Sequence, residues 1–171
     1  SAHMMALVAS MLPSGMFRPA RGQSLLDGAH WSRSYRCADG GWLSVQCLEP
    51  KFYAAFLRLL ELDSDPDFSR QYDPALWPAL AIRLEALFAT RPRDHWAAVF
   101  DGSDACVAPV LSPDEAAIDP HMAARASWAA GDLLQPAPAP RFDGRAAPVA
   151  AIPARDQHRA DILAMLDNAG A

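Results

Sequence analysis

The sequence predicts an α+β fold, a small domain built from a β-hairpin, several helices and additional short strands. Three observations lead to this class. Asp39-Gly40-Gly41 separates two strand-like runs, which is a strong local hairpin signal. Apolar residues then recur at helical spacing after Pro50 and again between residues 74 and 90. Because the order is hairpin, helices, strand and helix, the sequence does not predict a βαβ series.

The hairpin should consist of strands over residues 34–38 and 42–48, the second with a well-buried face. Pro50 suits the first turn of the following helix, because a proline there leaves no N–H unsatisfied. The expected apolar stripe of this helix consists of Phe52, Tyr53, Phe56, Leu57, Leu59 and Leu60. Such an aromatic stripe is typical of a core.

Further elements follow along the chain. A helix between residues 74 and 90 should carry Pro78 in its first turn, and a shorter helix should begin near Thr90. The inward face of the first of these helices is expected to be Leu76, Leu80, Leu84, Leu87 and Phe88. A buried strand is predicted over 105–111. Ser112 and Glu115 then match a capping box, with a proline between them at the first helical position.

Composition divides the chain into four parts. Residues 1–4 resemble an expression scar, and 5–30 indicate the end of a helical linker and a connector. The small α+β domain is expected over 31–135, ending in a last strand or a pair of short strands. Residues 136–171 are rich in proline and alanine, which favours an extended tail that closes on a weakly amphipathic helix.

Charge and cysteine content exclude several functions. Of the 171 residues 51% are hydrophobic and 20% charged, so a packed core is expected. The net charge is −5 and no basic stripe is present, which argues against a nucleic-acid partner. The apolar segment 5–17 is shorter than the roughly 20 residues that a membrane-spanning helix needs. Cys37, Cys47 and Cys106 show no CxxC spacing, which favours a reducing compartment over a zinc site or a disulfide framework.

Most motifs that carry chemistry are missing from the sequence. It has no GxxxxGK[ST] or GxGxxG phosphate loop and no GxSxG nucleophile elbow. The histidines outside the first four residues lack metal-ligand spacing, so surface or structural roles are predicted and no metal is expected: they are His30, His95, His121 and His158. The default role of the three cysteines is inert packing.

Glu49 is the one position for which the residues themselves suggest chemistry. It stands between a predicted strand and the helix that Pro50 begins, where Ser, Asp or Asn would be the better cap. The helix dipole favours a negative charge there, whereas shelter by the apolar strand and the aromatic helix would disfavour it. A carboxylate in such a place suits proton abstraction. The alternative is that an acidic residue near a helix N-terminus only stabilises the helix.

Several ordered blocks between Leu25 and Phe142 resemble one enzyme family. They are "LLDG", "YRCADGGWLSVQCLEPKFYAAFLRLL", "WPAL", "RDHWAAVF", "DACVAPVLSPDEA", "PHMAAR" and "QPAPAPRF". Together they are similar to the C-terminal half of α-methylacyl-CoA racemases, which belong to the family III CoA-transferase (CaiB/BaiF) group. The resemblance implies the small domain of the CaiB/BaiF fold, with the Rossmann-like large domain absent from this chain and two subunits interlocked in the complete enzyme.

The resemblance also implies a reaction and a site residue. The racemases invert the α-carbon of a 2-methylacyl-CoA thioester through an enolate, with no cofactor besides the CoA that is part of the substrate. A His–Glu pair and an Asp define the two faces, and the Glu of the "EPxFY" motif corresponds to Glu49. The implied partners are acyl-CoA, the large domain and a second copy of the chain. The composition, rich in Ala, Arg and Pro, favours a location in the cytoplasm. Two alternatives stay open, a family III CoA-transferase and a non-catalytic assembly domain.

Overall fold

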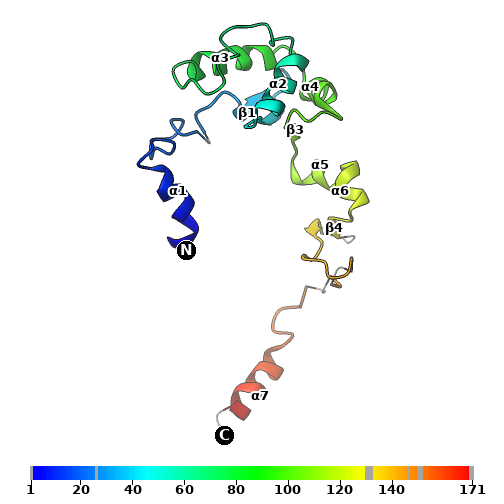
Figure 1. The fold of residues 1–171 in the computed structure, drawn as a ribbon. Helices are drawn as coiled ribbons and strands as arrows, with labels where there is room; N and C mark the ends of the chain where they lie inside the picture. The colour runs from blue at the N-terminus through cyan, green and yellow to red at the C-terminus, as the bar shows by residue number, and fades with distance from the viewer. Residues whose placement is uncertain (1, 26, 130–132, 146, 150–151, 170–171) are drawn as a thin grey trace. The chain divides into compact units, whose positions relative to one another are not determined.

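The computed structural model describes residues 2–25, 27–129, 133–145, 147–149 and 152–169 (Figure 1). The chain separates into two compact units, Ser1–Val110 and Leu111–Ala171. Helices and short antiparallel sheets occur together, so the predicted α+β class is confirmed.

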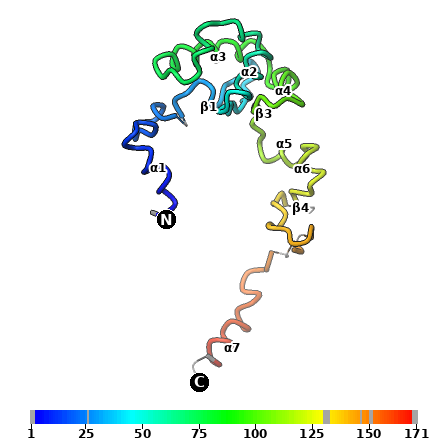
Figure 2. Tube along the Cα trace, viewed as in Figure 1, coloured from blue at the N-terminus to red at the C-terminus, as the bar shows by residue number. Residues whose placement is uncertain are grey.

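The first unit is built on a three-stranded antiparallel sheet. After a 3-10 turn (η1, Ala2–Met5) and a short helix (α1, Ala6–Met11), the chain forms β1 (Ser32–Arg36) and β2 (Trp42–Gln46). It then passes through three helices and returns as β3 to pair with β2 (Figure 2). The remaining bounds are α2 Pro50–Leu59, α3 Trp77–Phe88, α4 Arg93–Phe100 and β3 Val107–Val110. Helix α3 contacts β1, and α4 contacts both β2 and β3.

The hairpin forms where the Asp-Gly-Gly signal predicted it. Gly40 has a φ of +84°, a conformation that suits glycine, and the Cys37 N–H donates to the Gly41 carbonyl over 2.8 Å to close the turn. The Asp39 carboxylate accepts from the backbone N–H groups of Gly41 (3.0 Å) and Arg93 (3.1 Å), which joins the turn to α4. Strand β1 (32–36) begins and ends two residues earlier than predicted, and β2 (42–46) ends two residues earlier. Strand β1 stops at Arg36 because the turn already closes at Cys37.

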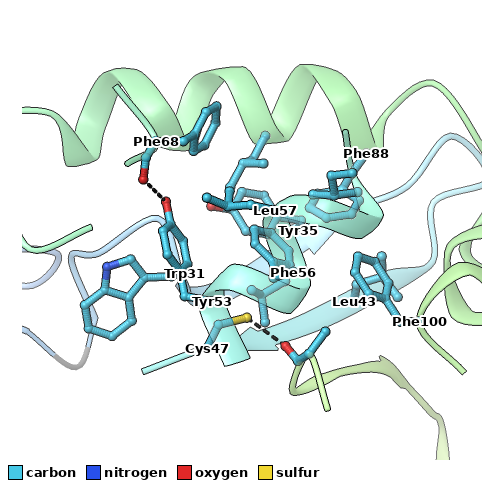
Figure 3. Packing of buried hydrophobic residues seen from close by; sticks show 14 of the residues in the cluster. Trp31, Tyr35, Leu43, Cys47, Tyr53, Phe56, Leu57, Phe68, Phe88 and Phe100 are labelled. Atoms are coloured by element: carbon cyan, nitrogen blue, oxygen red, sulfur yellow. Dashed lines mark hydrogen bonds between the residues drawn. The ribbon is translucent and has the colours of Figure 1, made fainter. Parts of the chain in front are cut away.

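The core lies between the sheet and the three helices, and its centre is aromatic (Figure 3). The Phe56 ring stacks on Phe100 with centroids 5.8 Å apart, and Phe88 meets Trp96 edge-on at 5.2 Å. Helix α2 buries Tyr53, Ala55, Phe56 and Leu57. Phe52 and Leu59, expected in the same stripe, are only half-buried because the buried face is centred on Phe56.

Helix α3 also follows its prediction in part. Pro78 lies in its first turn, and Leu80, Leu84 and Phe88 are buried. Leu76 and Leu87, expected on the same inward face, are half-buried because they lie at its margin.

Two other predictions need correction. The strand expected over 105–111 is shorter, Val107–Val110, and alternates between half-buried and exposed residues. Among the described strands it lies at the edge of the sheet beside β2, a position where Pro109 is tolerated because its missing N–H breaks no ladder bond. Thr90 does not begin α4. Its hydroxyl donates to the Leu87 carbonyl over 2.6 Å at the end of α3, and Pro92 is the N-cap of α4.

The second unit contains short elements. They are α5 Pro113–Ile118, α6 Pro120–Ala124, β4 Trp128–Ala129, β5 Gln135–Pro136 and α7 Arg159–Ala169. The capping box is confirmed, since the Glu115 N–H donates to the Ser112 hydroxyl and the Ser112 N–H donates to the Glu115 carboxylate. The short strands and the terminal helix occur where they were expected. Helix α6, capped by Asp119, was not predicted.

Candidate active site

Glu49 lies at the junction between β2 and α2, and it caps the helix with its backbone alone. Its carbonyl accepts from the N–H groups of Phe52 and Tyr53, both at 3.0 Å. Its φ of −77° and ψ of 142° are the extended conformation that a following proline favours. The carboxylate makes no capping hydrogen bond and the residue is exposed. The expected shelter between strand and helix is therefore absent, because α2 turns its apolar face toward the core.

The charged surroundings of Glu49 come from two segments, residues 49–52 and 104–106. The Glu49 and Asp104 carboxylates act on the thiol of Cys106, whose pKa is raised first by partial burial and then by these two charges. The ammonium of Lys51 opposes this rise, while its Nζ lies 4.4 Å from the centroid of the Phe52 ring. Cys106 is exposed and has a φ of +52°. With its pKa raised, the Cys106 thiol stays protonated at neutral pH and is a poor nucleophile.

The backbone that leads to Glu49 is held by a loop that is distant in sequence. The Gln71 side-chain amide donates to the carbonyls of Cys47 (2.9 Å) and Leu48 (3.0 Å), and the Tyr72 hydroxyl donates to the Leu48 carbonyl over 2.6 Å. Gln71 is buried, whereas Tyr72 is half exposed. Sequence reasoning missed both, because a Gln and a Tyr in an acidic loop carry no local signal of this contact.

Tyr53, the last residue of the EPKFY motif, points into the core and not toward Glu49. Its hydroxyl donates to the Phe68 carbonyl over 2.9 Å and lies 2.7 Å from Nε2 of His30 (Figure 3 shows the bond to Phe68). Burial raises the pKa of Tyr53 and lowers the pKa of His30 to about 4. Both are neutral at pH 7. Tyr53 thus fixes the first turn of α2 from inside. His30, for which a surface or structural role was predicted, is buried in the core beside it.

The remaining candidates offer no second site. No group of three or more His, Cys, Asp or Glu side chains within the described ranges could hold a metal ion. Cys37 and Cys47 are buried and form no disulfide, and burial raises the pKa of Cys47 to about 12. A pocket of about 540 Å³ lies between the 14–28 connector and the start of α3, with Tyr72 in its wall. Glu49 is not among the residues that line this pocket. No described helix is long and apolar enough to cross a membrane.

Comparison with known proteins gives the family. The sequence model of CoA-transferase family III matches residues 1–159. The α-methylacyl-CoA racemase of Mus musculus is 38% identical over 129 residues, 75% of this chain and 34% of that protein. The Homo sapiens racemase is 35% identical over 128 residues, 73% of this chain and 33% of that protein. The chain thus spans about a third of the curated relatives it matches.

A solved structure agrees on the fold. The crystal structure of a mutant of Rv3272 from Mycobacterium tuberculosis superposes with a TM-score of 0.57 at 16% identity, covering 95% of this chain and 44% of that one. At this identity the likeness concerns the fold alone. Together with the match over most of the chain, it confirms the resemblance first seen in the motif blocks: the chain belongs to CoA-transferase family III.

Proposed function

We propose that this chain is the C-terminal portion of an α-methylacyl-CoA racemase-like enzyme and that Glu49 is its contribution to the active site. The observation that carries the proposal is the Glu49 carboxylate, which takes no part in capping and stays exposed on a fixed backbone. An acid that only stabilised the helix would be expected to bond to the free N–H groups of the first turn. The similarity to the mouse and human racemases supports the same assignment.

The chemistry follows from the thioester. Its carbonyl delocalises the electrons left when the α-proton is removed, so an enolate forms, and return of a proton to the opposite face inverts the α-carbon. The proposal places the imidazole and the second acid of this exchange in a large domain outside this chain. Glu49 would accept a hydrogen bond from that imidazole, fix its orientation and stabilise its protonated form. The enzyme would need no cofactor beyond the CoA of its substrate.

The exposure of Glu49 favours a site completed by a second surface. Leu48, the residue directly before it, is 40% exposed, so an apolar side chain is also open to a covering surface. A large domain covering both would remove water from the acid and strengthen its hydrogen bond to the imidazole. We propose that this surface belongs to the second subunit of a homodimer, in the cytoplasm. The proposal therefore assigns no racemase activity to this chain alone.

A family III CoA-transferase is the second candidate, because the family match covers both reactions. Such an enzyme would move CoA between two acids through an aspartyl thioester, with the nucleophile outside this chain. The two functions differ in their product. A racemase exchanges the α-proton of a 2-methylacyl-CoA with solvent and needs no acceptor acid, whereas a transferase forms a new thioester only when a free carboxylate is added.

The test is Glu49→Gln in the complete enzyme, followed by α-proton exchange of 2-methylacyl-CoA in heavy water. We expect exchange to fall by roughly 10²–10⁴-fold. Glu61→Gln is the matched control, the same change on an exposed residue just past the C-terminal end of α2, and it should leave the rate unchanged. Equal rates for Glu49→Gln and the unaltered enzyme would remove Glu49 from the mechanism. Exchange by the isolated chain would contradict its predicted inactivity.

A further inference from the structure

We propose that Gln71 is the positioning residue for Glu49, an inference that rests on the proposed function. The junction it holds is short. Strand β2 ends at Gln46 and α2 begins at Pro50, so residues 47–49 belong to neither element. The Cys47 N–H is bound by the Trp31 carbonyl at 2.9 Å, but the carbonyls of Cys47 and Leu48 need donors from elsewhere.

Gln71 supplies these donors from one amide group. Its nitrogen carries two hydrogens, and the distances of 2.9 and 3.0 Å place one on each of the two consecutive carbonyls. A side chain bound in this way fixes the orientation of both peptide planes. Because the second of these planes ends at the nitrogen of Glu49, the amide directs the backbone from which the carboxylate projects.

The backbone of Gln71 is itself fixed by hydrogen bonds from the core. Its backbone carbonyl accepts two indole N–H groups, from Trp31 and Trp77, both at 2.9 Å. The two indoles are buried and meet edge-on, with ring centroids 6.1 Å apart. Gln71 itself is only 6% exposed. Gln71 therefore connects the core to the junction before Glu49. Its backbone carbonyl binds the two tryptophan rings, and its side-chain amide binds the carbonyls of Cys47 and Leu48.

The arrangement separates the positioning of Glu49 from its chemistry. The side-chain amide of Gln71 bonds to the backbone carbonyls of Cys47 and Leu48, and Pro50 restricts Glu49 from the other side. Tyr72 adds a third donor to the same stretch, at the Leu48 carbonyl. Loss of the Gln71 amide should leave the carboxylate present but misplaced, and a displacement of about 1 Å from the productive geometry can cost 10²-fold in rate.

The test is a double-mutant cycle in the complete enzyme, with α-proton exchange in heavy water as the readout. Gln71→Met keeps the length of the side chain and removes both donors. We expect it to lower kcat by up to about 10²-fold with little change in KM when Glu49 is present. In the Glu49→Gln background the same change should lower kcat by less than about twofold, because the group being positioned is gone. Leu84→Ala, a core change in the middle of α3, is the control and should leave kcat per folded enzyme unchanged in both backgrounds.

An equal loss from Gln71→Met in both backgrounds would overturn the proposal, since a general structural defect does not depend on Glu49. No loss from Glu49→Gln itself would refute the proposed function, which is a separate result. If Gln71→Met does not fold, Tyr72→Phe takes its place, because it removes one donor from a half-exposed residue. It should cost about threefold in kcat, only when Glu49 is present. No loss, or the same loss in both backgrounds, would again contradict the proposal.

Discussion

Replacing the buried imidazole of His30 by an amide, in His30→Gln, should remove a defined part of the acid sensitivity of this fold. The Tyr53 hydroxyl donates to the Phe68 carbonyl, which can only accept, so the Tyr53 oxygen must accept from His30 Nε2–H. The lone pair of His30 is then on Nδ1, which is buried and has no hydrogen-bond partner among the described residues. A proton added there would create a buried charge with no acceptor, and burial lowers the pKa of His30 to about 4.

The sign and size of the effect follow from this pKa. Above the ordinary value of 6.5 both the folded and the unfolded chain carry a neutral His30, so the residue costs nothing. As the pH falls below 6.5 the unfolded chain binds a proton that the native state refuses, and stability is lost until the pH reaches about 4. At 1.36 kcal/mol per pKa unit, the total loss is about 3 kcal/mol, and about 1.4 kcal/mol is already lost at pH 5.5.

The measurement is urea unfolding at pH 7.5 and pH 5.5, followed by tryptophan fluorescence. His95, His121 and His158 are exposed and are the same in both proteins, so their contributions cancel in the comparison. The unaltered protein should lose about 1.4 kcal/mol more than His30→Gln between these two pH values. In the unaltered protein the ring C–H signals of His30 should also show no titration by NMR above pH 5. Equal pH dependence of the two proteins, or a His30 titration near pH 6.5, would refute the argument.

Three further predictions concern stability. Phe56→Ala removes the ring stacked between Tyr53 and Phe100 and should cost about 3–5 kcal/mol in urea unfolding, whereas a cost below 1 kcal/mol would mean the site collapses freely. Gly40→Ala forces a left-handed φ of +84° and should cost about 1–2 kcal/mol in the same measurement, an unchanged midpoint being the contrary result. Ser112→Ala breaks the capping box and should weaken α5 by about 1 kcal/mol, seen as faster amide hydrogen exchange over residues 113–118 and contradicted by unchanged exchange.

Sequence reasoning worked where the chemistry is local. The Asp-Gly-Gly turn, Pro50 and the Ser112 capping box each act within four residues, and the structure has all three. It failed where a contact spans the chain. His30 meets Tyr53 across 23 positions and Gln71 meets Cys47 across 24, so no pattern of spacing marks either contact. The apolar run over 105–111, which contains β3, likewise gave no sign that the strand would lie at an edge of the sheet.

The predictions for Glu49 were likewise right for its local backbone and wrong for its surroundings in the fold. Its place before Pro50 and its resemblance to the EPxFY motif follow from the sequence, as does its backbone conformation, because a residue before proline is restricted to extended geometry. The exposure of the Glu49 side chain, in contrast, does not follow from the sequence. A carboxylate between an apolar strand and an aromatic helix was expected to be sheltered, yet helix α2 rotates Tyr53 and Phe56 inward and leaves Glu49 on the outer side of its first turn.

The hydrogen bonds that hold the backbone before Glu49 lower the free-energy cost of completing the proposed site. Ordering the backbone of a residue costs about 1–2 kcal/mol, so a flexible three-residue junction would consume about 3–6 kcal/mol when a covering domain closed over it. Gln71, Tyr72 and Pro50 order residues 47–49 beforehand through contacts inside the first unit. Only the side-chain torsions of Glu49 then remain to be fixed on closure. In the proposed site the small domain would thus bear most of the cost of ordering Glu49 when it folds, and the covering surface would supply the imidazole and the second acid.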